Sequence, residues 1–151
     1  MLDVSHLNEA GFWEVVHYSE APLVATHSNV HSITPHSRNL TNDQLRAIAD
    51  SDGMVGLNFA TAFLREDGKM LADVPMAQIL KHLDYLIEVL GEDRVGFGSD
   101  YDGAVMPDQL HDVSALPNLR HAMTDHGYDE ILIKKICHEN WLRVLETTWG
   151  S

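Results

Sequence analysis

The sequence has few basic residues and only one cysteine among its 151 residues. Ten Lys and Arg residues stand against 23 Asp and Glu residues, which gives a formal net charge of −13. Nucleic acids and anionic membranes bind clustered Lys and Arg, so this balance excludes both as expected partners. The single cysteine, Cys137, excludes an internal disulfide and fits a reducing compartment, so we expect a cytoplasmic protein.

Long apolar runs are missing as well. No stretch approaches the ~20 apolar residues that a membrane-spanning helix needs, and the N-terminus lacks the basic and then apolar pattern of a signal peptide. With 44% hydrophobic and 22% charged residues, the composition is that of an ordinary globular protein. We therefore expect one domain over residues 1–151, without membrane attachment.

Four short apolar segments alternate with helical patterns along the chain. Strands are predicted at residues 2–5, 23–26, 54–59 and 94–98. Helices are predicted at residues 8–18, 41–50, 75–90 and 116–126, with two short helices in 129–148. Short strands that are apolar throughout favour a parallel sheet covered on both faces, which is an α/β fold. Residues 61–71 are predicted to be a polar connection.

Polar side chains end the four predicted strands: His6, His27, Asn58 and Asp100. Parallel α/β folds bind their ligands at these strand ends. Imidazole nitrogens bind zinc (Zn²⁺), and a carboxylate nearby can move the proton of a metal-bound water, so the set suits a metal hydrolase. The alternative, hydrogen-bonded loop residues without a metal, has about equal weight on chemistry alone.

The loop that follows His27 is long and contains one cation, Arg38. A guanidinium at the mouth of such a fold can bind a substrate carboxylate with two hydrogen bonds, although an ordinary surface arginine is the more common case. His31 and His36 are expected to be exposed residues of this loop, and Asp102 either functions or bonds its own loop. Cys137 is expected in the core. The remaining histidines are predicted at the surface or at helix caps: His17, His82, His111, His121, His126 and His138.

Five segments in order carry a resemblance to a known family. They are residues 3–6 (Asp-Val-Ser-His), 21–28 (Ala-Pro-Leu-Val-Ala-Thr-His-Ser), 35–41 (Pro-His-Ser-Arg-Asn-Leu-Thr), 96–103 (Gly-Phe-Gly-Ser-Asp-Tyr-Asp-Gly) and 139–144 (Glu-Asn-Trp-Leu-Arg-Val). Together these segments resemble the renal (membrane) dipeptidase family of zinc peptidases. The resemblance extends over essentially the whole chain, and the Arg38 segment and the 96–103 segment argue against another barrel amidohydrolase.

The resemblance implies a TIM-type (β/α)8 barrel with two zinc ions at its strand ends. The histidines that match His6 and His27 are ligands of one zinc in that family. The arginine that matches Arg38 holds the C-terminal carboxylate of a dipeptide substrate. The aspartate that matches Asp100 interacts with the substrate amine and assists proton transfer, while a water between the zinc ions attacks the peptide carbonyl.

The family's barrel is about twice as long as this chain. The resemblance therefore implies that residues 1–151 are the C-terminal half, with strands five to eight. The family's His-x-Asp pair and bridging glutamate have no counterpart here, so at most one zinc is expected from this chain alone. Two functions remain open: a part of a zinc dipeptidase, or a non-catalytic half-barrel that binds a metal or associates with itself. Two unpaired edges, at 2–5 and 94–98, are expected to pair with a second copy or with a complementary N-terminal fragment, and we expect a homo-oligomer.

Overall fold

A computed structural model describes residues 1–150. Its sheet has four parallel strands in the order of the sequence: β1 (Leu2–Asp3), β2 (Leu23–Ala25), β3 (Met54–Leu57) and β4 (Val95–Phe97). Each strand is one or two residues shorter than predicted, but its position is confirmed. Parallel neighbours place all four carboxyl ends at the same edge of the sheet, where the predicted site residues lie.

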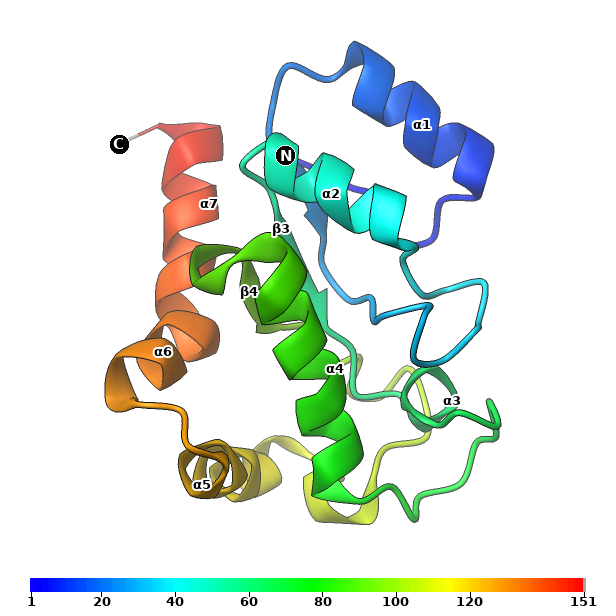
Figure 1. Cartoon of the computed structure of the whole chain (residues 1–151), viewed down its shortest axis with the longest axis vertical. Helices are drawn as coiled ribbons and strands as arrows, with labels where there is room; N and C mark the ends of the chain where they lie inside the picture. Colours follow the sequence, from blue (N-terminus) through cyan, green and yellow to red (C-terminus); the bar gives the residue numbers. More distant parts are fainter. Residues whose placement is uncertain (151) are drawn as a thin grey trace.

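Helices connect the strands (Figure 1). The α-helices are α1 (Glu9–Tyr18), α2 (Asn42–Asp50), α3 (Thr61–Leu64), α4 (Met76–Leu90), α5 (Leu116–His126), α6 (Glu130–Lys134) and α7 (Asn140–Trp149). A π-helical turn, η4 (Lys135–Glu139), joins α6 to α7, and three short 3-10 turns are η1 (Glu92–Arg94), η2 (Asp108–Leu110) and η3 (Val113–Ala115). The predicted helices are confirmed. The polar connection predicted at 61–71 is wrong at its start, because α3 is mostly buried there.

Local sequence signals define several helix ends. Thr41 and Gln44 form a capping box at the start of α2, which satisfies two otherwise unpaired backbone donors. Asn8 caps α1 by accepting from the backbone N–H of Gly11 at 2.8 Å. Gly91 ends α4 with φ of 81°, a conformation that favours glycine. These signals explain why the predicted bounds of α1, α2 and α4 agree closely with the structure.

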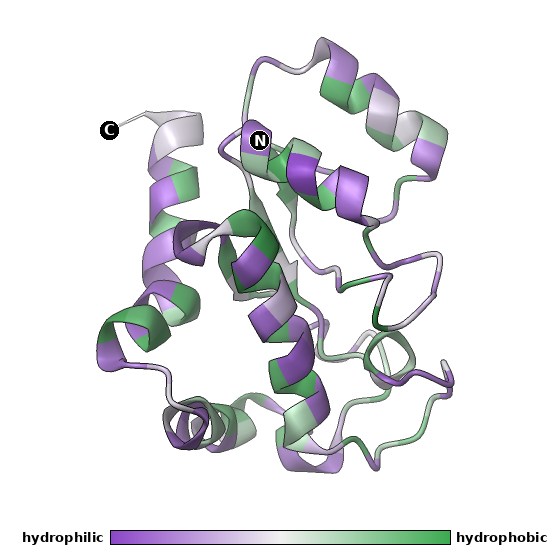
Figure 2. Cartoon of the chain, in the orientation of Figure 1, coloured by the Kyte–Doolittle hydropathy of each residue, from purple (hydrophilic) through white to green (hydrophobic). Residues whose placement is uncertain are grey.

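The two faces of the sheet have different coverings. Alternate strand residues point to opposite faces, so Leu23 and Ala25 belong to the main core, whereas Val24 belongs to a separate cluster. Helices α2 and α4 contact the strands on the first face. Val144 and Trp141 of α7 pack with Val24 in the second cluster. Figure 2 shows green and purple residues interspersed along α2 and α4, as expected for helices with one buried face.

The β4 edge is covered by side chains of α7. Asn140 Nδ2 donates to the Val95 carbonyl at 2.8 Å, and Trp141 Nε1 donates to the Phe97 carbonyl at 3.0 Å. Carbonyl groups along a strand alternate in direction, and these two bond to α7 instead of a further strand. Within the described residues β4 has β3 as its one strand neighbour, as predicted for an edge strand, and α7 bonds two of its carbonyl groups.

The β1 edge remains exposed among the described residues. Leu2 of β1 is 61% exposed, and Tyr18 at the end of α1 is 80% exposed. A groove of about 430 Å³ runs beside them and is also lined by Leu7 and Val15. No helix within residues 1–150 is both long and apolar enough to cross a membrane.

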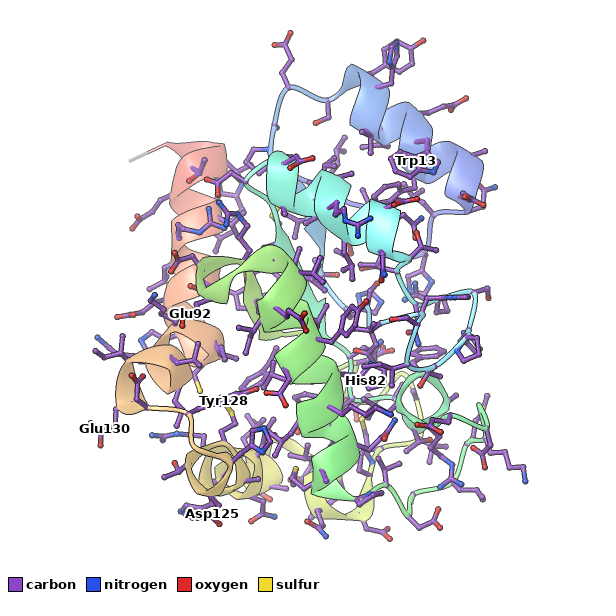
Figure 3. All side chains as sticks on the ribbon, in the orientation of Figure 1. Trp13, His82, Glu92, Asp125, Tyr128 and Glu130 are labelled. Carbon is purple, nitrogen blue, oxygen red and sulfur yellow. The ribbon has the colours of Figure 1, made fainter. Side chains whose placement is uncertain are left out.

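His82 is fully buried on α4, so the prediction that it lies at the surface or caps a helix is wrong. Its Nδ1 accepts from the backbone N–H of Val30 at 3.3 Å, so Nε2 carries the proton and donates to the Leu64 carbonyl at 3.2 Å. Nε2 also lies 3.3 Å from Thr34 Oγ1. Figure 3 shows His82 on the side of α4 toward α3. One imidazole thus joins α4 to the loop after β2 and to α3.

Candidate functional site

Two imidazoles meet at the carboxyl ends of β1 and β2. His6 Nε2 and His27 Nε2 are 2.9 Å apart, and the ring centroids are 4.9 Å apart with a tilt of 51°. His6 is exposed and His27 is half-buried. The structure therefore brings together the two histidines that the sequence singled out, with their Nε2 atoms within hydrogen-bond distance of each other.

Asp100 and Arg38 approach the same strand end from two other segments. Asn58 Nδ2 donates to Asp100 Oδ2 at 3.0 Å and lies 3.4 Å from the His27 carbonyl. Arg38 Nη2 donates to that carbonyl at 3.4 Å, and its guanidinium lies 5.6 Å from the centre of the Phe63 ring. Asn58 thus positions Asp100, and its place at the end of a predicted strand was the signal for such a role.

His6, Arg38 and Asp100 line one pocket of about 240 Å³. Its other walls come from α3 and from the loop after β4, including Phe63 and Val105. Sequence reasoning missed the α3 wall, because four residues are too few for a helical pattern. A cation and an anion in one small pocket suit a ligand that carries both charges.

The backbone around Asp100 adopts a conformation that few non-glycine residues occupy. Asp100 and Asp102 have φ of 62° and 66°. A Cβ at Gly103 would lie 2.5 Å from Asp100 Oδ1, and one at Gly98 would lie 1.8 Å from the Thr26 carbonyl oxygen. Strained backbone of this kind is concentrated at functional sites. Asp102 is exposed and does not line the pocket.

Burial shifts the ionisation of the two best enclosed groups. It lowers the pKa of His27, because an imidazolium is poorly solvated there, and the negative charge of Asp100 opposes this only in part. Burial also lowers the pKa of Arg38, again opposed by Asp100. His27 is therefore neutral at pH 7, which is the form of histidine that binds metals.

The two imidazoles fit part of a metal site. Nitrogen ligands at 2.0–2.1 Å in tetrahedral zinc would be separated by about 3.3 Å, close to the observed 2.9 Å between the Nε2 atoms. Among residues 1–150, no group of three or more His, Cys, Asp or Glu side chains is placed to hold a metal ion. His6 and His27 therefore provide two donors, fewer than the three or four protein ligands of a typical zinc site.

The other histidines lie outside this pair. His31 and His36 are half-buried, not exposed as predicted. His36 Nδ1 accepts from the backbone N–H of Arg38 at 3.1 Å, so His36 shapes the turn that presents the guanidinium. Cys137 is half-buried against the main core. The five histidines that are exposed as predicted are His17, His111, His121, His126 and His138.

Comparisons with known proteins agree on one family. The sequence profile of the membrane dipeptidases, peptidase family M19, matches residues 1–149. An uncharacterized protein in the pqqA 5' region of Klebsiella pneumoniae is 52% identical over 148 residues, which cover 98% of this chain and 55% of that protein. The crystal structure of dipeptidase AC, a metallopeptidase of family M19, is 60% identical with a TM-score of 0.99, over 100% of this chain and 45% of that one.

A metallopeptidase from Rhodobacter sphaeroides, solved with a phosphinate mimic of the dipeptide L-Ala-D-Ala, is also 60% identical, with a TM-score of 0.98 over 99% of this chain and 42% of that one. The chain thus spans about half the length of these relatives. Its four parallel strands form the C-terminal half of a TIM-type barrel, as the sequence predicts. The chain belongs to the membrane dipeptidase family, peptidase family M19.

Proposed function

We propose that this chain provides part of the active site of a zinc dipeptidase. In this proposal His6 and His27 hold one zinc ion, Arg38 binds the C-terminal carboxylate of the dipeptide, and Asp100 binds its amine. The observation that supports it most is the 2.9 Å approach of the two Nε2 atoms beside the pocket that Arg38 and Asp100 share. Imidazole ligands suit zinc, as they also suit copper, iron and nickel.

The charges of the pocket match a dipeptide in its zwitterionic form. Arg38 is half-buried and held near the Phe63 ring, which limits its movement and favours a two-bond contact with a carboxylate. Asp100 accepts one hydrogen bond from Asn58 and has further acceptor capacity for an ammonium group. The dipeptide mimic named for the Rhodobacter sphaeroides relative supports this substrate class.

The residues of this chain divide the work of hydrolysis. A bound zinc would supply Lewis acidity and lower the pKa of a bound water. Arg38 orients the substrate, and Asn58 orients the Asp100 carboxylate. Asp100 accepts a proton from the attacking water at Oδ1 or Oδ2 and passes it to the leaving amine. Because His27 is neutral, its imidazole has a lone pair available to bind a metal.

A non-catalytic half-barrel is the second candidate. The observation that favours it is the absence, within residues 1–150, of a third metal donor near His6 and His27. Such a chain binds at most one metal ion and does not turn over substrate. The expected cytoplasmic location stays a prediction in either case.

Self-association is proposed through the β1 side only. The groove beside Leu2 and Tyr18 is apolar and exposed, whereas α7 covers β4. We expect a dimer in analytical ultracentrifugation, and Leu2→Lys should shift it to a monomer. A compact wild-type monomer would refute this proposal.

The proposed function is tested by counting zinc per chain and by assaying a panel of dipeptides. Both measurements use this chain alone and this chain mixed with the N-terminal part of a full-length relative. We expect up to one zinc per isolated chain and hydrolysis only in the mixture. His27→Ala should abolish zinc binding, while the matched variant His31→Ala should retain it. Unchanged zinc content in His27→Ala contradicts the ligand assignment, and hydrolysis by the isolated chain contradicts the view that its site is partial.

A further inference from the structure

We propose that Asp3 and Thr26 form a hydrogen-bond relay that fixes the tautomer of His27, so that its Nε2 lone pair faces His6. The relay rests on the proposed role of His27 as a metal ligand. It assigns a positioning role to two residues at the ends of β1 and β2. Neither residue would touch the metal or the substrate.

The relay is a short chain of side-chain contacts. Thr26 Oγ1 lies 2.5 Å from Asp3 Oδ2 and 2.7 Å from His27 Nδ1. The second carboxylate oxygen, Asp3 Oδ1, accepts from the backbone N–H groups of Thr26 and Ser5, each at 3.0 Å. Asp3 is thus held in place by β2 and by its own strand, and Thr26 stands between it and His27.

The direction of each hydrogen bond follows from counting protons. Burial raises the pKa of Asp3, but the hydrogen bonds from Thr26 and Ser5 together bring it below its ordinary value, so this carboxylate is ionised and only accepts. The single hydroxyl proton of Thr26 must therefore go to Asp3. Thr26 Oγ1 can then only accept from His27, which places the imidazole proton on Nδ1.

The proton on Nδ1 determines the state of Nε2, on the opposite side of the His27 ring. With its proton on Nδ1, His27 presents a lone pair at Nε2, which lies 2.9 Å from His6 Nε2. A histidine ligand needs this lone pair on the nitrogen that binds the metal, and its other nitrogen commonly donates to a carboxylate, a carbonyl or a water. In this chain the Thr26 hydroxyl lies between the His27 imidazole and the Asp3 carboxylate, so the pattern contains one more residue. The tautomer of His27 that can bind a metal through Nε2 is therefore already present in the metal-free protein.

The relay also links two strands. Asp3 and His6 belong to the β1 segment, whereas Thr26 and His27 belong to the β2 segment. Ser5 Oγ adds a further link by accepting from the backbone N–H of His27 at 3.1 Å. Correct docking of β1 on β2 therefore sets both the position of His6 and the proton position on His27.

The test uses Thr26→Val, which keeps the branched shape and removes the hydroxyl, and Thr26→Ser, which restores it. Nitrogen-15 NMR of the metal-free protein, at a pH where imidazole is neutral, reports which nitrogen of His27 carries the proton. Chelator competition reports zinc affinity. Thr124→Val is the matched control, because the Thr124 hydroxyl is exposed and donates only to the Arg120 carbonyl.

We expect the Nδ1–H form of His27 in wild type, in Thr26→Ser and in Thr124→Val, and a mixture of the two tautomers in Thr26→Val. Zinc affinity should fall about 10- to 100-fold in Thr26→Val and recover in Thr26→Ser. An Nε2–H form in wild type overturns the relay, even if Thr26→Val does not fold. Unchanged tautomer and affinity in folded Thr26→Val also overturn it. A wild type with the Nδ1–H form and no zinc affinity supports the relay and refutes the proposed function.

Discussion

The buried His82 should make the stability of the fold depend on pH. Burial lowers its pKa to about 4, from an ordinary value of 6.5. Below pH 6.5 the unfolded chain takes up a proton at this position and the folded chain does not. The free energy of unfolding therefore falls as the pH falls from 6.5 toward 4, and it is highest above 6.5.

The size of the effect follows from the shift in pKa. A difference of one in pKa between the folded and the unfolded chain corresponds to about 1.4 kcal/mol. Because the pKa of His82 falls from 6.5 to about 4, the free energy of unfolding should decrease by on the order of 3 kcal/mol between pH 7 and pH 4. A domain of ordinary stability has only about 5–15 kcal/mol, so this one group accounts for a large share. The free energy of unfolding should change by at most about 1.4 kcal/mol per pH unit, because unfolding takes up one proton at this site.

Urea denaturation at half-unit steps from pH 7 to pH 4.5 measures this slope. In His82→Gln the side chain does not titrate, so the difference between wild type and variant should shrink steadily as the pH falls. At pH 7 the variant should be less stable, because the imidazole joins α4 to Val30 and Leu64. His111→Gln, which removes an exposed histidine, is the control. Parallel pH profiles of wild type and His82→Gln would show that His82 is not protonated on unfolding, and the reasoning would fail.

Three substitutions test the site and the packing. Arg38→Lys should raise the KM for dipeptides about 10- to 100-fold in the mixture with the N-terminal part of a relative, because lysine loses the two-bond contact, whereas Arg46→Lys should leave it unchanged. Asn140→Ala should lower the free energy of unfolding by about 3 kcal/mol in urea, because two backbone carbonyl groups lose their donor, and Asn118→Ala should cost less than 1 kcal/mol. Gly98→Ala should lower the melting temperature by more than 10 °C, since its Cβ would lie 1.8 Å from a carbonyl oxygen, while Gly11→Ala in α1 should not. Equal effects of a variant and its control would contradict each argument.

The sequence predicts the parallel sheet and the strand-end cluster because both follow from local patterns. An apolar strand ends where polar residues begin, and parallel strands bring those ends together, so the sequence alone predicts that His6, His27 and Asp100 lie at one edge of the sheet. The buried His82 had a signal too, since it lies three residues after Ile79 and four before Leu86, on the apolar face of α4. That position outweighs the usual preference of histidine for partly exposed sites.

No local sequence pattern predicts that α7 covers the β4 edge. Asn140 and Trp141 bond to carbonyl groups 44 to 48 positions earlier, and side-chain to backbone contacts at that distance leave no periodic pattern. The relay from Asp3 to His27 is hidden for the same reason, because the Thr26 hydroxyl that completes it lies 23 positions from Asp3. The geometry of the strands makes these contacts possible, but the sequence does not reveal which side chain completes them.

The sheet of four parallel strands has two edges, β1 and β4. A head-to-tail filament needs two complementary surfaces on each subunit, so that every added copy leaves a new end for the next. In this fold the two edges differ, because α7 bonds two carbonyl groups of β4 whereas β1 lies beside an exposed groove. Closing the barrel leaves no edge for such growth, because the other four strands of a (β/α)8 barrel pair with both β1 and β4.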